Sequence, residues 1–286
     1  MRLDVKDLYF SYGDKQVLRG ITLSLDRPGL YCIIGPNGVG KSTLVKCLNR
    51  LLTPSSGKVE LNGKNISEMS FGEISRVIGY IPVRSEEGFS TTVFEAVLLG
   101  RFPHRKWGST SEDYRIVSET MKITKIEDLA FEDTFGISAG QHQRVMIAKG
   151  LAQQPSVLIL DEPTANLDAR YQISITRLLH KLAIERNMIV VMISHDLNIA
   201  SRFADKVLLM TEPGVLFKMG NVQEVVTEEN IRYAYGVDCN IIDVKGRPHV
   251  ILLDELPDDE IDDMHHAPNI DHQQTRYTVS SETRNL

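Results

Sequence analysis

The sequence predicts an α/β fold with a mostly parallel core sheet, an N-terminal antiparallel β-subdomain and an α-helical insertion. Polar and apolar residues alternate over residues 3–25, which is typical of short antiparallel strands with one exposed face. Short apolar segments resembling strands buried on both faces follow at residues 30–34, 77–81, 157–160 and 188–193. Residues 85–151 contain no strong strand pattern, so we expect a helical insertion there.

Local signals set the expected boundaries within this frame. Tyr12-Gly13-Asp14 predicts the first turn, and Asn62-Gly63 predicts a hairpin after a strand at residues 58–61. Capping boxes at Ser70/Glu73 and Thr92/Glu95 predict two helix starts. Further helical patterns are found at residues 93–99, 114–121, 138–151, 173–184 and 228–235. A hairpin is expected at residues 207–219, and two short strands are expected before residue 253.

Charge divides the chain into a body and a tail. The net charge is −6, and residues 254–286 contain nine acidic and two basic residues, which leaves the body at +1. We expect one domain at 1–253 with a helical subdomain at about 85–151, followed by a disordered acidic tail. A metal site formed by the tail histidines His265, His266 and His272 is the alternative. A nearly neutral body does not indicate nucleic-acid binding.

Neither a membrane span nor a signal peptide is expected. The longest apolar run is residues 188–193, far shorter than the roughly 20 residues that a spanning helix needs. No apolar segment follows the first residues, as it would in a signal peptide. Cys32 and Cys47 lie in apolar patterns and are expected to be buried free thiols.

Residues 35–43 match G-x-x-x-x-G-K-[ST], the phosphate-binding P-loop. They lie between a predicted strand and a helical pattern of apolar residues from 44 to 52, so a chance match in a glycine-rich turn is disfavoured. We expect Lys41 to reach the β- and γ-phosphates of a nucleotide and Ser42 to bind Mg²⁺. The expected nucleotide-binding residues are Gly35, Pro36, Asn37, Gly38, Val39, Gly40, Lys41, Ser42 and Thr43.

Two further strand ends provide the polar groups that phosphate chemistry requires. Asp161 and Glu162 follow the apolar segment 157–160, and His195 follows the segment 188–193. We expect Asp161 to bind Mg²⁺ and Glu162 to accept a proton from an attacking water. His195 can donate to the γ-phosphate. Solvated side chains at strand ends are the alternative, but ligands bind at the carboxyl ends of strands in such sheets.

With these residues the chain resembles the nucleotide-binding subunits of ABC transporters. Residues 137–144 are similar to the signature motif LSGGQ-x-QR, and residues 166–168 are similar to the D-loop. Residues 193–196 resemble the switch-histidine loop, and Tyr12 lies where the family stacks an aromatic ring on adenine. The resemblance covers residues 1–253 and implies a P-loop NTPase core of the ABC ATPase fold.

The resemblance also implies the cofactor, the assembly and the location. ATP and Mg²⁺ would bind between two copies of the chain, with the P-loop of one copy facing the signature of the other. Ser138, Gly140, Gln141 and Asp168 would then contact ATP. The helical insertion would contact polytopic permease subunits at the cytoplasmic face of the membrane, and a substrate-binding protein would act indirectly.

A narrower resemblance concerns the transported substrate. Residues 99–104 are similar to the GRxPH stretch of importers for iron–siderophore, haem and cobalamin, and residues 225–237 resemble the ending of the same subfamily. An ordinary loop after a helix is the alternative for residues 99–104. The sequence does not name the substrate, because substrate selectivity lies in other chains.

Two positions depart from the family pattern. Ala139 replaces the first signature glycine, and Val83 occupies the position of the Q-loop glutamine. No glutamine lies between Gln16 and Gln141, so a shifted register cannot supply it. Because valine has no hydrogen-bonding side-chain group, we expect slow hydrolysis with nearly normal ATP binding.

Two other functions remain open at this point. A soluble ABC ATPase of iron–sulfur assembly or DNA repair would not couple to transport, although the long coiled coils of the repair proteins are absent here. A regulatory nucleotide-binding module with hardly any turnover is compatible with Val83 and Ala139. The presence of Glu162 and His195 argues against that module.

Overall fold

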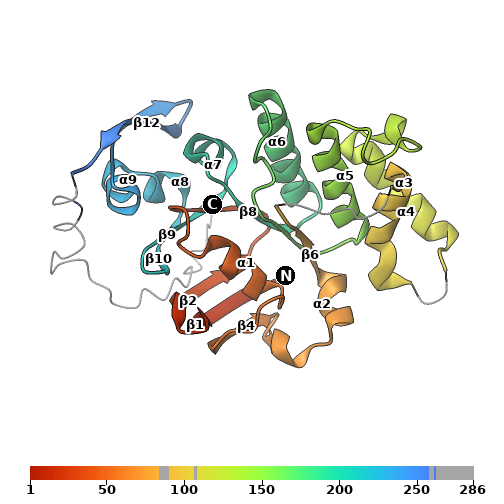
Figure 1. Cartoon of the computed structure of the whole chain (residues 1–286), viewed down its shortest axis with the longest axis horizontal. Helices are drawn as coiled ribbons and strands as arrows, with labels where there is room; N and C mark the ends of the chain where they lie inside the picture. Colours follow the sequence, from red (N-terminus) through yellow and green to blue (C-terminus); the bar gives the residue numbers. More distant parts are fainter. Residues whose placement is uncertain (84–89, 106–107, 258–260, 262–286) are drawn as a thin grey trace, which may run out of the picture.

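The computed structural model describes residues 1–83, 90–105, 108–257 and 261. Its N-terminal part is a four-stranded antiparallel sheet in the order β2-β1-β4-β5, seen at the bottom of Figure 1. The strands are β1 (Leu3–Tyr12), β2 (Lys15–Leu25), β4 (Ser56–Leu61) and β5 (Lys64–Asn65). Tyr12 pairs with Lys15, so the predicted turn is confirmed.

The core sheet has six strands in the order β10-β9-β3-β8-β7-β6. They are β3 (Gly29–Ile34), β6 (Ile78–Ile81), β7 (Val157–Leu160), β8 (Ile189–Ile193), β9 (Lys206–Thr211) and β10 (Val215–Gly220). All neighbours are parallel except β9 and β10, which form the predicted hairpin. The carboxyl ends of β3, β7 and β8 therefore meet at one edge of the sheet, where ligands bind in such folds.

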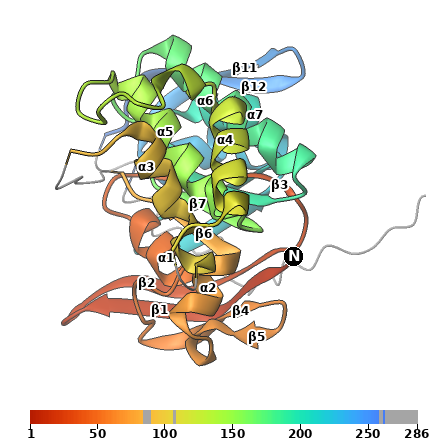
Figure 2. The ribbon, with the colours of Figure 1, turned by 90° about the vertical axis from the view of Figure 1, so that its right-hand side faces the viewer.

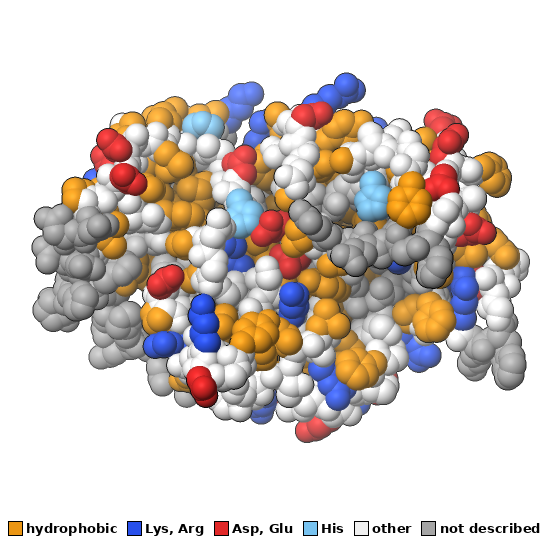
Figure 3. All heavy atoms as spheres, in the orientation of Figure 1, with side chains coloured by type: hydrophobic (Ala, Val, Ile, Leu, Met, Phe, Trp, Pro, Cys, Tyr) orange, Lys and Arg blue, Asp and Glu red, His pale blue; other side chains and the backbone are white. Residues whose placement is uncertain are grey.

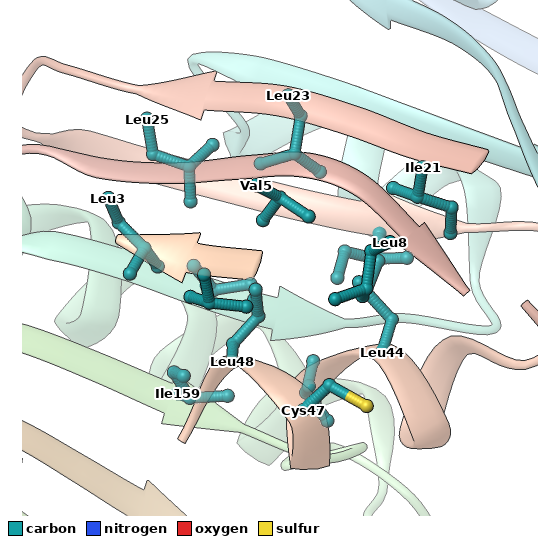
Figure 4. Packing of buried hydrophobic residues seen from close by; sticks show 14 of the residues in the cluster. Leu3, Val5, Leu8, Ile21, Leu23, Leu25, Leu44, Cys47, Leu48 and Ile159 are labelled. Carbon is teal, nitrogen blue, oxygen red and sulfur yellow. The ribbon is translucent and has the colours of Figure 1, made fainter. Parts of the chain in front are cut away.

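Two hydrophobic clusters cover the two faces of this sheet. In β3, Tyr31 and Ile33 belong to one cluster, while Leu30, Cys32 and Ile34 belong to the other. The first cluster is formed against helix α1 (Lys41–Leu48) and the antiparallel sheet, as Figure 4 shows. The second is formed against α6 (Ala169–Glu185), α7 (Leu197–Phe203), α8 (Val222–Val225) and α9 (Glu228–Tyr235). The prediction of strands buried on both faces is confirmed.

The helical insertion has its own core and lies at the right of Figure 1, next to β6; Figure 2 shows it from the side. It comprises α3 (Val93–Leu98), the 3₁₀ helix η2 (Leu99–His104), α4 (Ser111–Thr124), η3 (Glu127–Leu129) and α5 (Ala139–Ala152). The predicted capping box opens α3, and the other opens α2 (Phe71–Val77), which follows η1 (Ile66–Glu68). The prediction of a helical insertion is confirmed.

The C-terminal described part is a two-stranded antiparallel sheet of β11 (Val237–Val244) and β12 (Arg247–Glu255), which packs on α7 and α9. The second strand ends two residues beyond the predicted domain limit of 253. The acidic tail predicted from residue 254 lies mostly outside the described residues. No helix in the described ranges combines the length and the apolar character needed to cross a membrane.

One local expectation needs correction, one helix was not predicted, and one expectation is confirmed. The apolar pattern to residue 52 predicted a longer first helix, but α1 ends at Leu48 and Leu51 is exposed. Arg50 has a φ of +61°, which no α-helix tolerates, so the chain turns there. Helix α7 was not predicted. Cys32 and Cys47 are free and buried, as expected.

Candidate active site

The P-loop joins the end of β3 to the start of α1. Gly40 caps α1 with a φ of +103°, a conformation that residues with a Cβ rarely adopt. Gly35 has a φ of +145°, and a Cβ there would lie 2.2 Å from the carbonyl oxygen of Met210. The loop is therefore fixed against β9 at its first glycine, which explains why the sequence needs glycine there. The loop leads into the N-terminus of α1, where free backbone N–H groups form a favourable place for phosphate.

Lys41 is buried and folded back on the loop. Its Nζ donates to the carbonyl oxygens of Gly35 and Pro36, both at 2.7 Å. Burial lowers the pKa of Lys41, and the nearby charges of Glu162 and Asp161 act against this shift. Both hydrogen-bond acceptors of Lys41 thus belong to the loop itself.

Asp161 follows β7 and lies beside Ser42. The Ser42 hydroxyl donates to Oδ1 of Asp161 at 3.0 Å, and the Tyr80 hydroxyl faces Oδ2 at 3.5 Å. Burial raises the pKa of Asp161, while the hydrogen bond from Ser42 lowers it. A hydroxyl and a carboxylate held this close are hard oxygen donors that fit Mg²⁺, which binds few protein ligands when phosphates supply the others.

Glu162 and His195 meet across the neighbouring strand ends of β7 and β8. Nε2 of His195 lies 2.5 Å from Oε1 of Glu162. Glu162 has a φ of +50°, an uncommon backbone conformation that turns the chain immediately after Asp161. Two adjacent carboxylates therefore face different partners: Asp161 faces Ser42, and Glu162 faces His195.

The predicted signature segment opens helix α5. Ser138 is the N-cap, and its backbone N–H donates to Oε1 of Gln141 at 2.9 Å, while the Ser138 hydroxyl accepts from the Gln141 N–H at 3.4 Å. Ala139 is exposed, whereas Gly140 is buried against the ring of Tyr171. Within the described part of the chain, no hydrogen bond joins residues 138–141 to residues 35–43. Within one described subunit, the two predicted ATP-binding segments are thus not held together by hydrogen bonds.

Asp168 and Tyr12 lie at the ends of other elements. Asp168 is the N-cap of α6, and its Oδ1 accepts the backbone N–H of Tyr171 at 2.9 Å. Tyr12 ends β1 with half of its surface exposed, and its ring packs edge-on against Phe10 with 4.8 Å between the centroids. The open ring face is compatible with stacking on a base.

Val83 follows β6 and is 43% exposed, and the residues after it, 84–89, lie outside the described ranges. Tyr80 on the same strand was missed by the sequence interpretation. It pairs with Ile159 of β7, so its hydroxyl lies near Asp161. Tyr80 could be identified only by knowing that β6 pairs with β7, and the sequence alone does not reveal which strands pair.

Comparison with known proteins agrees with this fold. The family model described as "ABC transporter" matches residues 18–165. The chain therefore belongs to the ABC transporter family, and it is an ABC-type ATPase.

Two similar proteins have names that state the compound they transport. The ferric enterobactin transport ATP-binding protein FepC of Escherichia coli is 38% identical over 258 residues, covering 88% of this chain and 94% of FepC. The iron(3+)-hydroxamate import ATP-binding protein FhuC of Bacillus subtilis is 36% identical over 242 residues, covering 84% of this chain and 90% of FhuC. The structure of a putative metal-chelate type ABC transporter in an inward-facing conformation matches with a TM-score of 0.77 and 28% identity, covering 88% of this chain and 97% of the matched one.

Proposed function

We propose that this ATPase powers an importer of metal chelates of the iron–siderophore, haem or cobalamin class. The observation that carries the proposal is the similarity over most of the chain to relatives named for ferric enterobactin and iron-hydroxamate transport. The GRxPH-like stretch at residues 99–104 supports the same assignment. The alternative is a soluble ABC ATPase that hydrolyses ATP without driving import, and uptake measurements distinguish the two.

In the proposed reaction, the P-loop binds the phosphates of ATP and Tyr12 stacks on adenine. Lys41 exchanges the carbonyls of Gly35 and Pro36 for phosphate oxygens, which offer its ammonium a full negative charge. Ser42 and Asp161 hold Mg²⁺. The bound ion would neutralise charge on the β- and γ-phosphates.

Glu162 serves as the general base in this proposal. Its carboxylate accepts a proton from the water that attacks the γ-phosphate. His195 already contacts Glu162 and lies at the adjacent strand end, so its ring can turn to donate to the γ-phosphate. Removal of the carboxylate charge should therefore stop hydrolysis but leave the groups that bind ATP in place.

We further propose a head-to-tail homodimer with two ATP sites. Ser138, Gly140, Gln141 and Asp168 of one subunit would face the ATP held by the other subunit. The N-terminus of α5 carries a partial positive charge that favours the γ-phosphate. The helical insertion would bind permease subunits at the cytoplasmic face of the membrane, and a substrate-binding protein would deliver the chelate to the permease.

Uptake by cells tests this proposal directly. A strain lacking the chain is supplied with either the wild type or Glu162→Gln, and the uptake of labelled ferric siderophore, haem and cobalamin is measured. We expect one of these uptakes to depend on the wild type and to be lost with Glu162→Gln. If all three uptakes are independent of the chain while the purified protein hydrolyses ATP normally, the soluble ATPase is the correct assignment.

A further inference from the structure

Arg101 occupies the middle of η2, in the stretch similar to GRxPH, and its side chain points inward. Leu99 and Phe102 on either side are exposed, whereas Arg101 is only 5% exposed. Its Nε donates to Oδ1 of Asp113 at 2.9 Å. One terminal nitrogen donates to the carbonyl oxygen of Ala152 at 2.8 Å and to Oε1 of Gln154 at 2.9 Å. One guanidinium thus connects η2 both to α4 and to the C-terminal end of α5.

The first connection is to α4. Arg101 and Asp113 form an ion pair in which each side chain is 6% exposed. The other carboxylate oxygen of Asp113 accepts from the backbone N–H and the hydroxyl of Thr110, at 2.9 and 2.8 Å, in the capping box of α4. The Thr110 amide and Arg101 together lower the pKa of Asp113 to about 2. Asp113 is therefore charged, fully bonded and fixed to the first turn of α4.

The second connection is to the last turn of α5. Ala152 is the final residue of that helix, and its carbonyl would otherwise lack an intrahelical partner. The adjoining Gly100 packs so closely that a Cβ there would lie 2.1 Å from the carbonyl oxygen of Lys149. At the same end, the carbonyl oxygen of Gln153 lies 2.8 Å from Nε2 of His104. Residues 99–104 therefore contact the C-terminal end of α5 at three positions, through Gly100, Arg101 and His104.

The opposite end of this helix is the signature segment. Helix α5 has 14 residues and is about 21 Å long, short enough to move as a rigid rod. Arg144 holds its first half by donating to the Thr124 carbonyl at 2.8 Å and to the Ser174 hydroxyl at 2.7 Å. With Arg144 as the pivot, a displacement of the C-terminal end turns the N-terminal end.

We propose that Arg101 is a positioning residue for the signature segment: by holding the C-terminal end of α5, it aligns Ser138 and Gln141 with the ATP bound by the partner subunit. The inference rests on the proposed head-to-tail dimer. It gives residues 99–104 a physical role in this chain, namely to fix the direction of α5. A residue that only stabilised the insertion would not affect the dimer once the protein is folded.

The test measures ATP-dependent dimerisation in the Glu162→Gln background, where ATP is retained. Arg101→Lys keeps a positive charge near Asp113, but an ammonium cannot donate in three fixed directions as a guanidinium does. Arg101→Ala removes all three hydrogen bonds. Arg115→Ala is the matched control, because Arg115 pairs with Glu112 and Glu119 on the exposed face of α4 and does not reach α5.

We expect both Arg101 variants to weaken dimerisation by about tenfold or more, which is within the usual range of coupling between sites. Binding of a fluorescent ATP analogue to the monomer should change less than twofold, and Arg115→Ala should dimerise normally. Amide hydrogen exchange should quicken at residues 139–145 in Arg101→Lys, which keeps the proposal testable if Arg101→Ala does not fold. Normal dimerisation and normal exchange in Arg101→Lys would overturn the proposal. Failure of the parent Glu162→Gln to dimerise would instead overturn the proposed dimer.

Discussion

The contact between Gly140 and Tyr171 makes a quantitative prediction about the signature segment. A Cβ added to Gly140 would lie 2.5 Å from Cδ1 and 2.6 Å from Cε1 of the Tyr171 ring, distances that no packed structure accepts. The ring belongs to the first turn of α6, where the Tyr171 N–H is bonded to Asp168. Gly140→Ala must therefore displace the Tyr171 ring, helix α5 or the turn that Asp168 caps.

Two opposing terms set the size of the effect. Alanine stabilises a helix interior by roughly 1 kcal/mol relative to glycine, and by less at Gly140, which is the second residue of α5. Overpacking of this kind costs typically about 1–3 kcal/mol. We expect a net loss of about 0–3 kcal/mol in the free energy of unfolding. We also expect a larger loss of ATP-dependent dimerisation, because Gly140 and Asp168 are predicted to face ATP.

Urea unfolding and dimerisation in the Glu162→Gln background measure the two effects. Ala139→Gly is the matched control: Ala139 is exposed, so this change should alter stability by less than the roughly 1 kcal/mol of an interior site and create no clash. Adding Tyr171→Ala to Gly140→Ala should recover part of the lost stability, since it removes the ring that the new methyl group meets. A Gly140→Ala protein that is about 1 kcal/mol more stable than wild type would refute this reasoning.

Four further predictions concern other residues. Lys41→Ala should reduce the affinity for a fluorescent ATP analogue at least tenfold, because charge-assisted hydrogen bonds to phosphate are lost; unchanged affinity would exclude the P-loop assignment. Glu162→Gln should accumulate an ATP-bound dimer in size-exclusion chromatography with ATP and Mg²⁺, and a monomer with normal turnover would contradict the proposed base. Val83→Gln should raise steady-state ATPase activity or its coupling to transport with little change in nucleotide affinity, and an unchanged rate and coupling would show that the site is completed in another way. The pKa of Asp113 is about 2 in the folded protein, below its unfolded value of about 3.9, so its contribution to stability is complete above about pH 5 and is lost progressively as the pH falls toward about 2; urea unfolding of Asp113→Asn should lack this loss.

Local signals in the sequence predicted most of the elements correctly. Capping boxes at Ser70 and Thr92 depend on side chains three residues apart, so they can be recognised without knowing the rest of the fold. The end of α1 could not be predicted in this way. Leu51 continues the apolar spacing, but the chain has already turned at Arg50, where φ is +61°. Periodicity indicates that a helix is amphipathic, but not where packing stops it.

The same distinction applies to the candidate site. The positions of Asp161 and His195 could be predicted because each follows a strand, and the carboxyl ends of parallel strands meet at one edge. Lys41 could be predicted from the P-loop motif. The contact of Gly140 with Tyr171 was not predictable, because it depends on how α5 packs against α6. The family resemblance implied only that Gly140 would contact ATP. In the structure, the ring of Tyr171 already excludes a side chain there.

Val83 shows how strand pairing changes the interpretation of a missing side chain. The valine cannot bond to the metal site, but two contacts before it already connect β6 to Asp161. The Asp161 N–H donates to the Ile81 carbonyl at 2.9 Å, and the Tyr80 hydroxyl lies 3.5 Å from Oδ2 of Asp161. Since these contacts hold the carboxylate that we propose to bind Mg²⁺ without any group at position 83, ATP and Mg²⁺ binding should not depend on that position. An amide introduced by Val83→Gln would then add a contact near the attacking water, which is why we expect it to change turnover rather than affinity.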